Sequence, residues 1–297
     1  MRVLLDLAVV TGVAAALLWG CGFLLAWLVP RSYRPLLPLL APYLGLALIS
    51  AVGHYASAAG RPLRSVLWLF IALAAAGWAG LVFNRRLRRF PRSSAPILAV
   101  CLLAFALAVV PLLSLGYLTT LGTAIDGISY AVRSEYLQDA PFGLPDIAAG
   151  KPYLGWVRGQ IELIRAGDVM LVGVLGMLTR RRSFELLSVV PALFFALTAG
   201  SVYVWTRVSL RLGRRGALLA AILTGLSNLL LWPVYDNFLS QAIAVGLIPW
   251  CSRSAPRPSA GRIGGPPPSS GSSWAPWSRS IRSMPSTPWE WSSASGG

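Results

Sequence analysis

Residues 116–183 form a polar segment between two long apolar runs, and they include six of the ten acidic residues of the chain. These are Asp126, Glu135, Asp139, Asp146, Glu162 and Asp168. A carboxylate in such a segment can act as a general base toward a hydroxyl or an amine, or it can hold a divalent cation against a phosphate. It can also serve only to cap a helix. If the protein has a chemical activity, we therefore expect the residues that perform it to lie in this segment.

The residues that follow Asp126 read as a helix. A carboxylate near the N-terminus of a helix is favoured by the helix macrodipole. At about 100° per residue, Tyr130 and Arg133 fall on the same side of this helix as Asp126. Glu135 and Asp139 fall on the opposite side. We therefore expect the first three side chains to face a common pocket, and the last two to face solvent or lipid headgroups.

Lys151 is the only lysine among 26 basic residues. Its ammonium is a compact point charge that suits a phosphate, although a lone lysine also arises by chance. The three cysteines have no metal-binding spacing, and two of them lie inside apolar runs, where cysteine packs as a small hydrophobic residue. We predict no metal site and no organic cofactor. A divalent cation bound through a substrate phosphate is the one alternative.

Membrane helices are the elements that must position these residues. The chain is 56% hydrophobic and only 12% charged, whereas soluble domains are about 45–50% apolar and about 25% charged. A helix that crosses a bilayer needs about 20 apolar residues, and it satisfies its own backbone hydrogen bonds there. Six runs are long enough, at residues 4–29, 36–58, 63–83, 97–118, 184–206 and 217–235, and a seventh begins at 238 and stops near 249. The fold class predicted is an all-α, polytopic transmembrane bundle.

Arginine clusters indicate the orientation. Five arginines lie between residues 85 and 92, after the third run, and four lie between 207 and 215, after the fifth. Cytoplasmic loops carry an excess of Lys and Arg, so both connections are predicted to be cytoplasmic and the segment 116–183 extracytoplasmic. Arg61, Arg64 and the run 180–182 oppose this weakly. The formal charge of +16 is thus read as a topology signal in a cell-membrane protein, with no nucleic-acid partner.

Two features interrupt these patterns. Residues 169–178 are apolar but too few to cross a bilayer, which suits a short helix that lies at the interface or re-enters the membrane, capped by Asp168. Asp6 lies inside the first apolar run, where it is expected to pair with Arg2 or to reach the interface. The large loop is therefore predicted to carry short interfacial helices.

A second polar motif in the loop reads Lys151-Pro152-Tyr153-Leu154-Gly155-Trp156. With the helix that begins at Asp126, it resembles the GT-C glycosyltransferases, which move a sugar from a polyprenyl-phosphate carrier. In the aminoarabinose and protein O-mannosyl branches, the first large extracytoplasmic loop begins with Asp-Glu and continues with a Tyr-Ala and an Ala/Glu-Met/Leu helix. Later it has Lys-Pro-Pro-Leu-x-Tyr-Trp. The matching residues are Asp126, Tyr130, Ala131, Glu135, Lys151, Pro152, Leu154 and Trp156.

The resemblance implies a role for each matching polar residue. Asp126 would be the catalytic base and Lys151 a contact to the donor phosphate, while Tyr130, Arg133 and Trp156 would bind substrate. The implied partners are a polyprenyl-phosphate-linked sugar and the lipid bilayer. The sequence departs from the family at two positions: Gly127 replaces the second acidic residue, and Tyr153 replaces the second proline.

Three regions are predicted along the chain. Residues 1–95 form an N-terminal three-helix membrane region, and residues 96–249 form a partial GT-C-like core that contains the loop 116–183. Residues 250–297 contain no Leu, Val, Phe or Tyr and are expected to be a disordered, low-complexity tail. A natural tail is one interpretation. We favour the other, in which the reading frame is lost near codon 250 and the chain is the N-terminal part of a longer protein.

The predicted function is a membrane glycosyltransferase that moves a sugar from a polyprenyl-phosphate carrier to an extracytoplasmic acceptor. The alternative is a non-enzymatic polytopic membrane protein, such as a transporter subunit or a scaffold. A soluble enzyme has no supporting motif, since the sequence has no phosphate-binding glycine loop, no nucleophile elbow and no zinc signature.

Overall fold

The computed structural model of the protein describes residues 2–30, 33–84, 95–116, 118, 125–141, 167–236 and 239–251. These residues all belong to one compact unit, Met1–Ala255. The described part is helical and contains no strand, so the all-α prediction is confirmed for it. The predicted tail, 250–297, lies almost wholly outside the described residues. The division of the chain at residue 95 stays a prediction.

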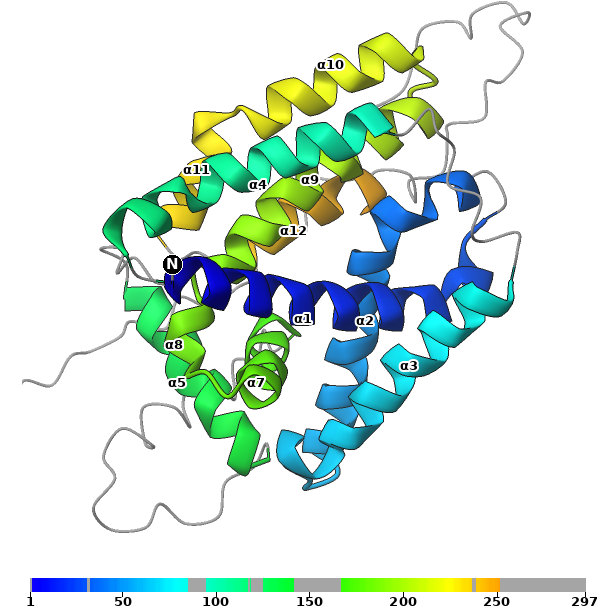
Figure 1. Cartoon of the computed structure of the whole chain (residues 1–297). Coiled ribbons are helices and arrows are strands. Elements are labelled where there is room, and N and C mark those ends of the chain that lie inside the picture. Colours follow the sequence, from blue (N-terminus) through cyan, green and yellow to red (C-terminus); the bar gives the residue numbers. More distant parts are fainter. Residues whose placement is uncertain are drawn as a thin grey trace, which may run out of the picture. The chain divides into compact units, whose positions relative to one another are not determined.

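The long helices match the apolar runs (Figure 1). They are α1 (Arg2–Leu24), α2 (Leu37–Ala58), α3 (Leu67–Phe83), α4 (Ala95–Leu115) and α9 (Val189–Val208). The 3₁₀ turns η2 (Arg34–Leu36) and η3 (Leu63–Val66) extend α2 and α3 at their starts, and η1 (Ala26–Leu28) follows α1. Five helices of the described part are thus long and apolar enough to cross a membrane. Such helices indicate a membrane protein.

The sixth predicted run, 217–235, is a bent pair rather than one straight helix. It comprises α10 (Arg214–Gly225) and α11 (Asn228–Tyr235), whose axes differ in direction by 43°. Ser227, between them, has an extended backbone with φ −69° and ψ 113°, so the helix cannot continue through it. Apolar content could not locate this bend, because apolar residues continue on both sides of it. The seventh run forms α12 (Leu239–Cys251).

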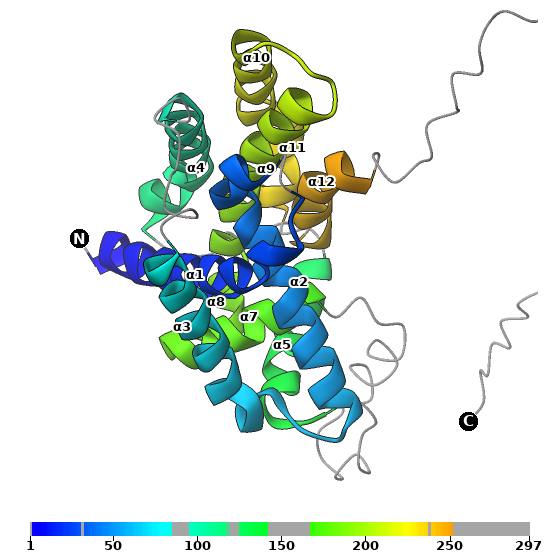
Figure 2. The same cartoon turned by 90° about the vertical axis from the view of Figure 1, so that its right-hand side faces the viewer.

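Glycines allow α1, α2 and α3 to approach closely where α1 crosses the other two helices (Figures 1 and 2). A Cβ atom built on Gly45 of α2 would lie 2.0 Å from the carbonyl oxygen of Leu18. One built on Gly77 of α3 would lie 1.8 Å from the carbonyl oxygen of Gly20. Helices in lipid associate through such close backbone contacts, since burial of apolar surface drives their association little there.

The polar segment contributes α5 (Ile125–Asp139) and α7 (Gly167–Thr179), followed by the short α8 (Ser183–Leu186). The prediction of a short helix after Asp168 is confirmed. Its residues from Asp168 to Gly176 are all buried, because α7 packs against α2, α5 and α1. A helix that is hydrophobic on every side needs such a covering. Within the described residues α7 is therefore enclosed by protein. Whether it lies at the interface or re-enters the membrane, the two expected positions, stays a prediction.

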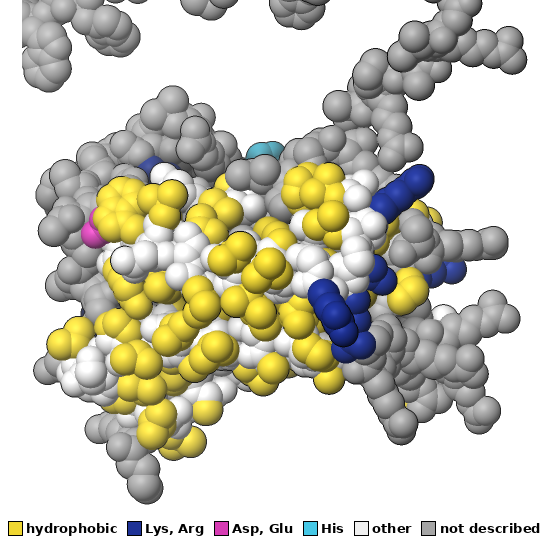
Figure 3. Space-filling view, turned by 90° about the horizontal axis from the view of Figure 1, so that it is seen from above, with side chains coloured by type: hydrophobic (Ala, Val, Ile, Leu, Met, Phe, Trp, Pro, Cys, Tyr) yellow, Lys and Arg dark blue, Asp and Glu magenta, His cyan; other side chains and the backbone are white. Residues whose placement is uncertain are grey.

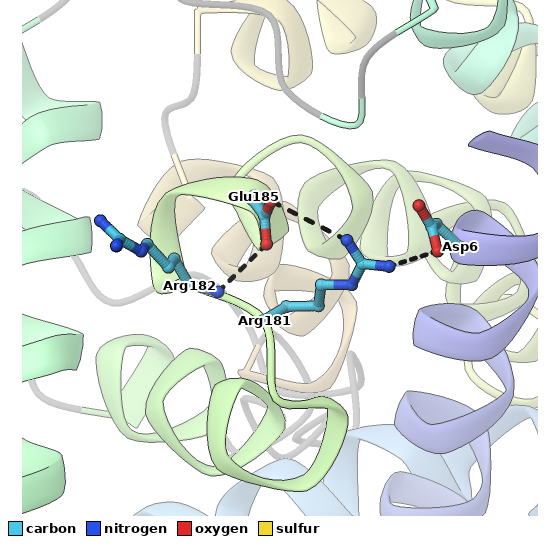
Figure 4. A network of polar contacts seen from close by, with 4 residues as sticks. All are labelled: Asp6, Arg181, Arg182 and Glu185. Carbon is cyan, nitrogen blue, oxygen red and sulfur yellow. Dashed lines mark hydrogen bonds and ion pairs between the residues drawn. The ribbon is translucent and has the colours of Figure 1, made fainter. Parts of the chain in front are cut away.

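Polar contacts hold the connection between α7 and α8. Arg180 has a left-handed backbone (φ 54°), and the N–H of Arg181 donates to the carbonyl of Gly176 at 3.1 Å, which is the Schellman ending of a helix. This ending directs the Arg181 guanidinium to the carboxylate of Asp6 on α1, with Glu185 at 3.9 Å on its other side (Figure 4). Asp6 thus pairs with Arg181, a partner that the sequence did not indicate, because residues 175 positions apart are adjacent in the fold. The side chain of Arg2, one of the partners expected from the sequence, lies outside what the structure describes.

The connections between the long helices fall into two groups. The Tyr33 and Ser209 hydroxyls are 3.3 Å apart, so the α1–α2 connection meets the end of α9. At the other end of α2, Arg64 pairs with Asp139 of α5 at 3.0 Å. On the face in Figure 3, hydrophobic side chains form a band, and basic side chains gather mainly at one end of it. Basic side chains gathered at one end of an apolar band are typical of helices that cross a membrane, where Lys and Arg lie in excess on one side.

Candidate functional site

Asp168 is a buried carboxylic acid in the first turn of α7. Its Oδ1 accepts a hydrogen bond from the backbone N–H of Val169 at 2.9 Å, and its Oδ2 accepts one from the hydroxyl of Ser240 on α12. A buried carboxylate needs donors of this kind, because removing it from water without them costs several kcal/mol. The N-terminus of α7 adds a favourable dipole. The fold therefore holds this carboxylate in one position.

The polar chain continues from Ser240 to α5. The hydroxyls of Ser240 and Tyr130 are 3.0 Å apart. A serine hydroxyl has one proton, so when it donates to an ionised Asp168 it accepts from Tyr130. Arg133, the next residue on the Tyr130 face of α5, is close enough for its positive charge to favour the ionised form of Asp168. Three helices thus supply one connected group: α5, α7 and α12.

A cavity of about 500 Å³ opens beside this group, between α2, the start of α7 and α12. Its polar lining includes Asp168, Ser240, Ser50 and Gln241. Its apolar lining is Leu46, Ala47, Ile243, Ala244 and Leu247. A cavity with one carboxylate, several hydroxyl and amide groups, and aliphatic walls suits a ligand with a polar head and a hydrocarbon part.

Burial raises the pKa of the Asp168 carboxyl above its ordinary value. The hydrogen bonds from Ser240 and from backbone N–H groups, and the charge of Arg133, lower this pKa but do not cancel the effect of burial. The group therefore takes up a proton at a higher pH than an exposed aspartate does. A carboxyl of this kind, beside a cavity, is typical of a site that exchanges protons or hydrogen bonds with a ligand.

The predicted site residues have different outcomes. Tyr130 and Arg133 lie on one face of α5 and both contribute to the polar group around Asp168. Neither is a lining residue of the cavity, and the common pocket predicted for them with Asp126 stays a prediction. Asp126 is in the first turn of α5, so a helix does begin there, but the position of its side chain lies outside what the structure describes. Lys151 and Trp156 lie outside the described residues. Their roles stay predictions.

The opposite face of α5 is occupied rather than free. The Glu135 carboxylate accepts a hydrogen bond from the backbone N–H of Ser183 at 2.7 Å, so it caps the start of α8. Asp139 has a side chain that is 66% exposed and pairs with Arg64. The predicted exposure is therefore confirmed for Asp139, whether to solvent or to lipid headgroups. Glu135 has a structural contact that the helical spacing alone could not show.

Sequence reasoning missed Asp168 and Ser240 as members of a site. Asp168 was assigned only a capping role, and Ser240 lies in an apolar run with no recognisable motif. One signal was present: residues 169–178 are apolar on every side, and a helix of that kind is buried in protein. The aspartate at its start was therefore a candidate for burial, which only the packing of α7 decides.

No group of three or more His, Cys, Asp or Glu side chains in the described residues could hold a metal ion.

Comparison with known proteins gives no match: no family model, no curated protein and no solved structure is significantly similar to this chain. The chemistry of the cavity beside Asp168 is therefore the basis for a function.

Proposed function

We propose that the protein transfers a sugar from a polyprenyl-phosphate carrier to an acceptor on the extracytoplasmic side of the cell membrane. The observation that carries this proposal is the cavity beside Asp168, which joins a buried carboxylate to aliphatic walls among apolar helices. A lipid-linked sugar has the same two parts, a hydroxyl-rich head and a hydrocarbon chain.

The cavity supports the proposal through its lining. Asp168 is positioned to accept hydrogen bonds from sugar hydroxyls, and Gln241 and Ser50 can donate them. Leu46, Ile243 and Leu247 offer apolar surface to the first isoprene units. Binding of the head and of the chain would then come from different walls of one cavity.

The chemical step is assigned to α5 and the loop that follows it. Asp126 takes the proton from the acceptor hydroxyl or amine, and the acceptor atom attacks the anomeric carbon. The bond from that carbon to the phosphate oxygen breaks, and polyprenyl phosphate leaves with the electron pair. Lys151 and Arg133 stabilise the negative charge on the leaving phosphate, while Tyr130 and Trp156 hold the sugar.

Filling the cavity tests whether it holds the carrier. Leu247→Trp is expected to weaken binding of a fluorescent polyprenyl phosphate by about 10-fold or more, since it replaces space at the apolar wall with an indole. Binding is measured by titration of the purified protein in nanodiscs. Leu223→Trp is the matched control, because Leu223 on α10 is 64% exposed and is not part of the cavity lining. Equal affinity in both variants, or no saturable binding in the native protein, would refute the proposed site.

Cysteine labelling tests the side of the membrane. In a variant without native cysteines, Asp139→Cys on α5 is expected to react with an impermeant thiol reagent on intact cells. Arg214→Cys, exposed at the start of α10, is expected to react only after the membrane is opened. Both side chains are exposed, so a difference in reaction reports the side and not burial. The reverse pattern would place the α5 end of the bundle in the cytoplasm and contradict extracytoplasmic transfer.

A further inference from the structure

A second cavity, of about 270 Å³, lies far from Asp168 along the chain, where the end of α1 and η1 meet η2 and the last turns of α3. Trp27, Phe23 and Leu24 form apolar walls, and Arg34 and Asn84 are its polar lining residues. Gly77 and Gly80 of α3 also line it, and at Gly80 the absence of a side chain leaves space open. At Gly80 an added Cβ would meet no atom within 4 Å.

The guanidinium of Arg34 is held at this cavity. Its Nε donates a hydrogen bond to the carbonyl oxygen of Val29 at 3.2 Å, so the connection between α1 and α2 fixes its direction. Among the described residues, no carboxylate lies within ion-pair distance of Arg34. The described ion pairs join Asp139 to Arg64, and Asp6 and Glu185 to Arg181. The remaining guanidinium N–H groups are suited to an anion.

The surroundings of the cavity are basic. The Tyr33 hydroxyl contacts Ser209, which brings the α9–α10 connection close to the α1–α2 connection. The α9–α10 connection and the adjoining ends of these two helices contain Arg207, Arg211, Arg214 and Arg215. In Figure 3, basic side chains gather at the same end of the hydrophobic band as the start of α10. An anion near Arg34 would therefore be in a positive field.

The indole of Trp27 lies at the cavity and is 72% exposed. Tryptophan is enriched where the headgroups of a bilayer meet its hydrocarbon, since the indole has an apolar body and a polar N–H. The exposed helices that flank the cavity are apolar enough to face lipid acyl chains. An anion that reaches Arg34 along these walls would carry hydrocarbon with it.

We propose that this cavity binds an anionic phospholipid, with the lipid phosphate on Arg34 and the start of the acyl chains along Trp27 and α3. Charge complementarity selects the phosphate, and the apolar walls select a lipid over a free inorganic ion. The site is independent of the sugar-transfer proposal, because it shares no lining residue with the cavity beside Asp168.

The test compares binding of phosphatidylglycerol and phosphatidylcholine to the delipidated protein by native mass spectrometry. The native protein is expected to prefer phosphatidylglycerol. Arg34→Gln is expected to lower this preference about 5-fold, since one basic residue near an anionic lipid contributes that much. Gly80→Leu keeps every charge but fills the cavity, so it is expected to reduce phosphatidylglycerol binding as well.

Arg64→Gln is the matched control, because Arg64 is 66% exposed beside Asp139 and does not line this cavity. It is expected to keep the native preference. The proposal is overturned if Arg34→Gln keeps that preference, if Gly80→Leu binds phosphatidylglycerol as well as the native protein does, or if Arg64→Gln loses the preference to the same extent as Arg34→Gln. Equal competition by inorganic phosphate at the lipid concentration would also overturn it, since the site would then recognise a free anion.

Discussion

Asp126→Asn is expected to lower the rate of sugar transfer by about 10²–10⁴-fold, which is the usual contribution of a positioned general base. Asn has nearly the size of Asp and still caps a helix N-terminus, so α5 is expected to form in the variant. Insertion and abundance should therefore be unchanged. The measurement is the initial rate of transfer in membrane vesicles from radiolabelled polyprenyl-phosphate mannose and from its aminoarabinose counterpart, at equal protein level.

The matched control is Asp139→Asn, the same change at the last residue of the same helix. Its carboxylate is 66% exposed and pairs with an equally exposed Arg64, and exposed pairs of this kind contribute about 0–1 kcal/mol. This variant is expected to transfer sugar at the native rate. Native transfer by Asp126→Asn would end the glycosyltransferase proposal and leave the non-enzymatic membrane protein as the better interpretation.

The long helices could be predicted from the sequence because their cause is local. A run of about 20 apolar residues must form a helix in a bilayer, whatever its neighbours are. The spacing of Tyr130 and Arg133 also depends only on the helical period, and it correctly placed both on one face of α5. The bend at Ser227 depends on backbone conformation instead, and apolar content carries no information about it.

The candidate site could be predicted only in part because its contacts join distant segments. Ser240 meets Asp168 across 72 positions, and Arg181 meets Asp6 across 175. No periodicity in a single sequence reports such pairs. The sequence did locate Asp168 at the start of a short helix, but a cap and a buried cavity residue have the same local pattern. Packing of α7 against α2 and α5 decides between them.

Asp168→Asn is expected to raise stability at neutral pH. Burial raises the folded-state pKa of this carboxyl above its unfolded value of about 3.9. Its contribution to stability is then fully present below the unfolded pKa and is lost as pH rises through the folded pKa. At neutral pH the native protein carries the cost of a buried charge, which a neutral Asn avoids. The Ser240 hydroxyl can rotate to accept from the new amide.

The same substitution is expected to weaken function, because a carboxylate that binds sugar hydroxyls is replaced by a weaker acceptor. A hydrogen bond to a charged group contributes about 1.5–3 kcal/mol, so transfer should fall by roughly 10- to 100-fold. Thermal unfolding in detergent checks the stability, with a shift in Tm of about 2–4 °C for each kcal/mol and a difference that shrinks toward acidic pH. Asp139→Asn should change neither quantity. A lower Tm at neutral pH would mean that Asp168 is a structural cap, and native transfer would remove it from the site.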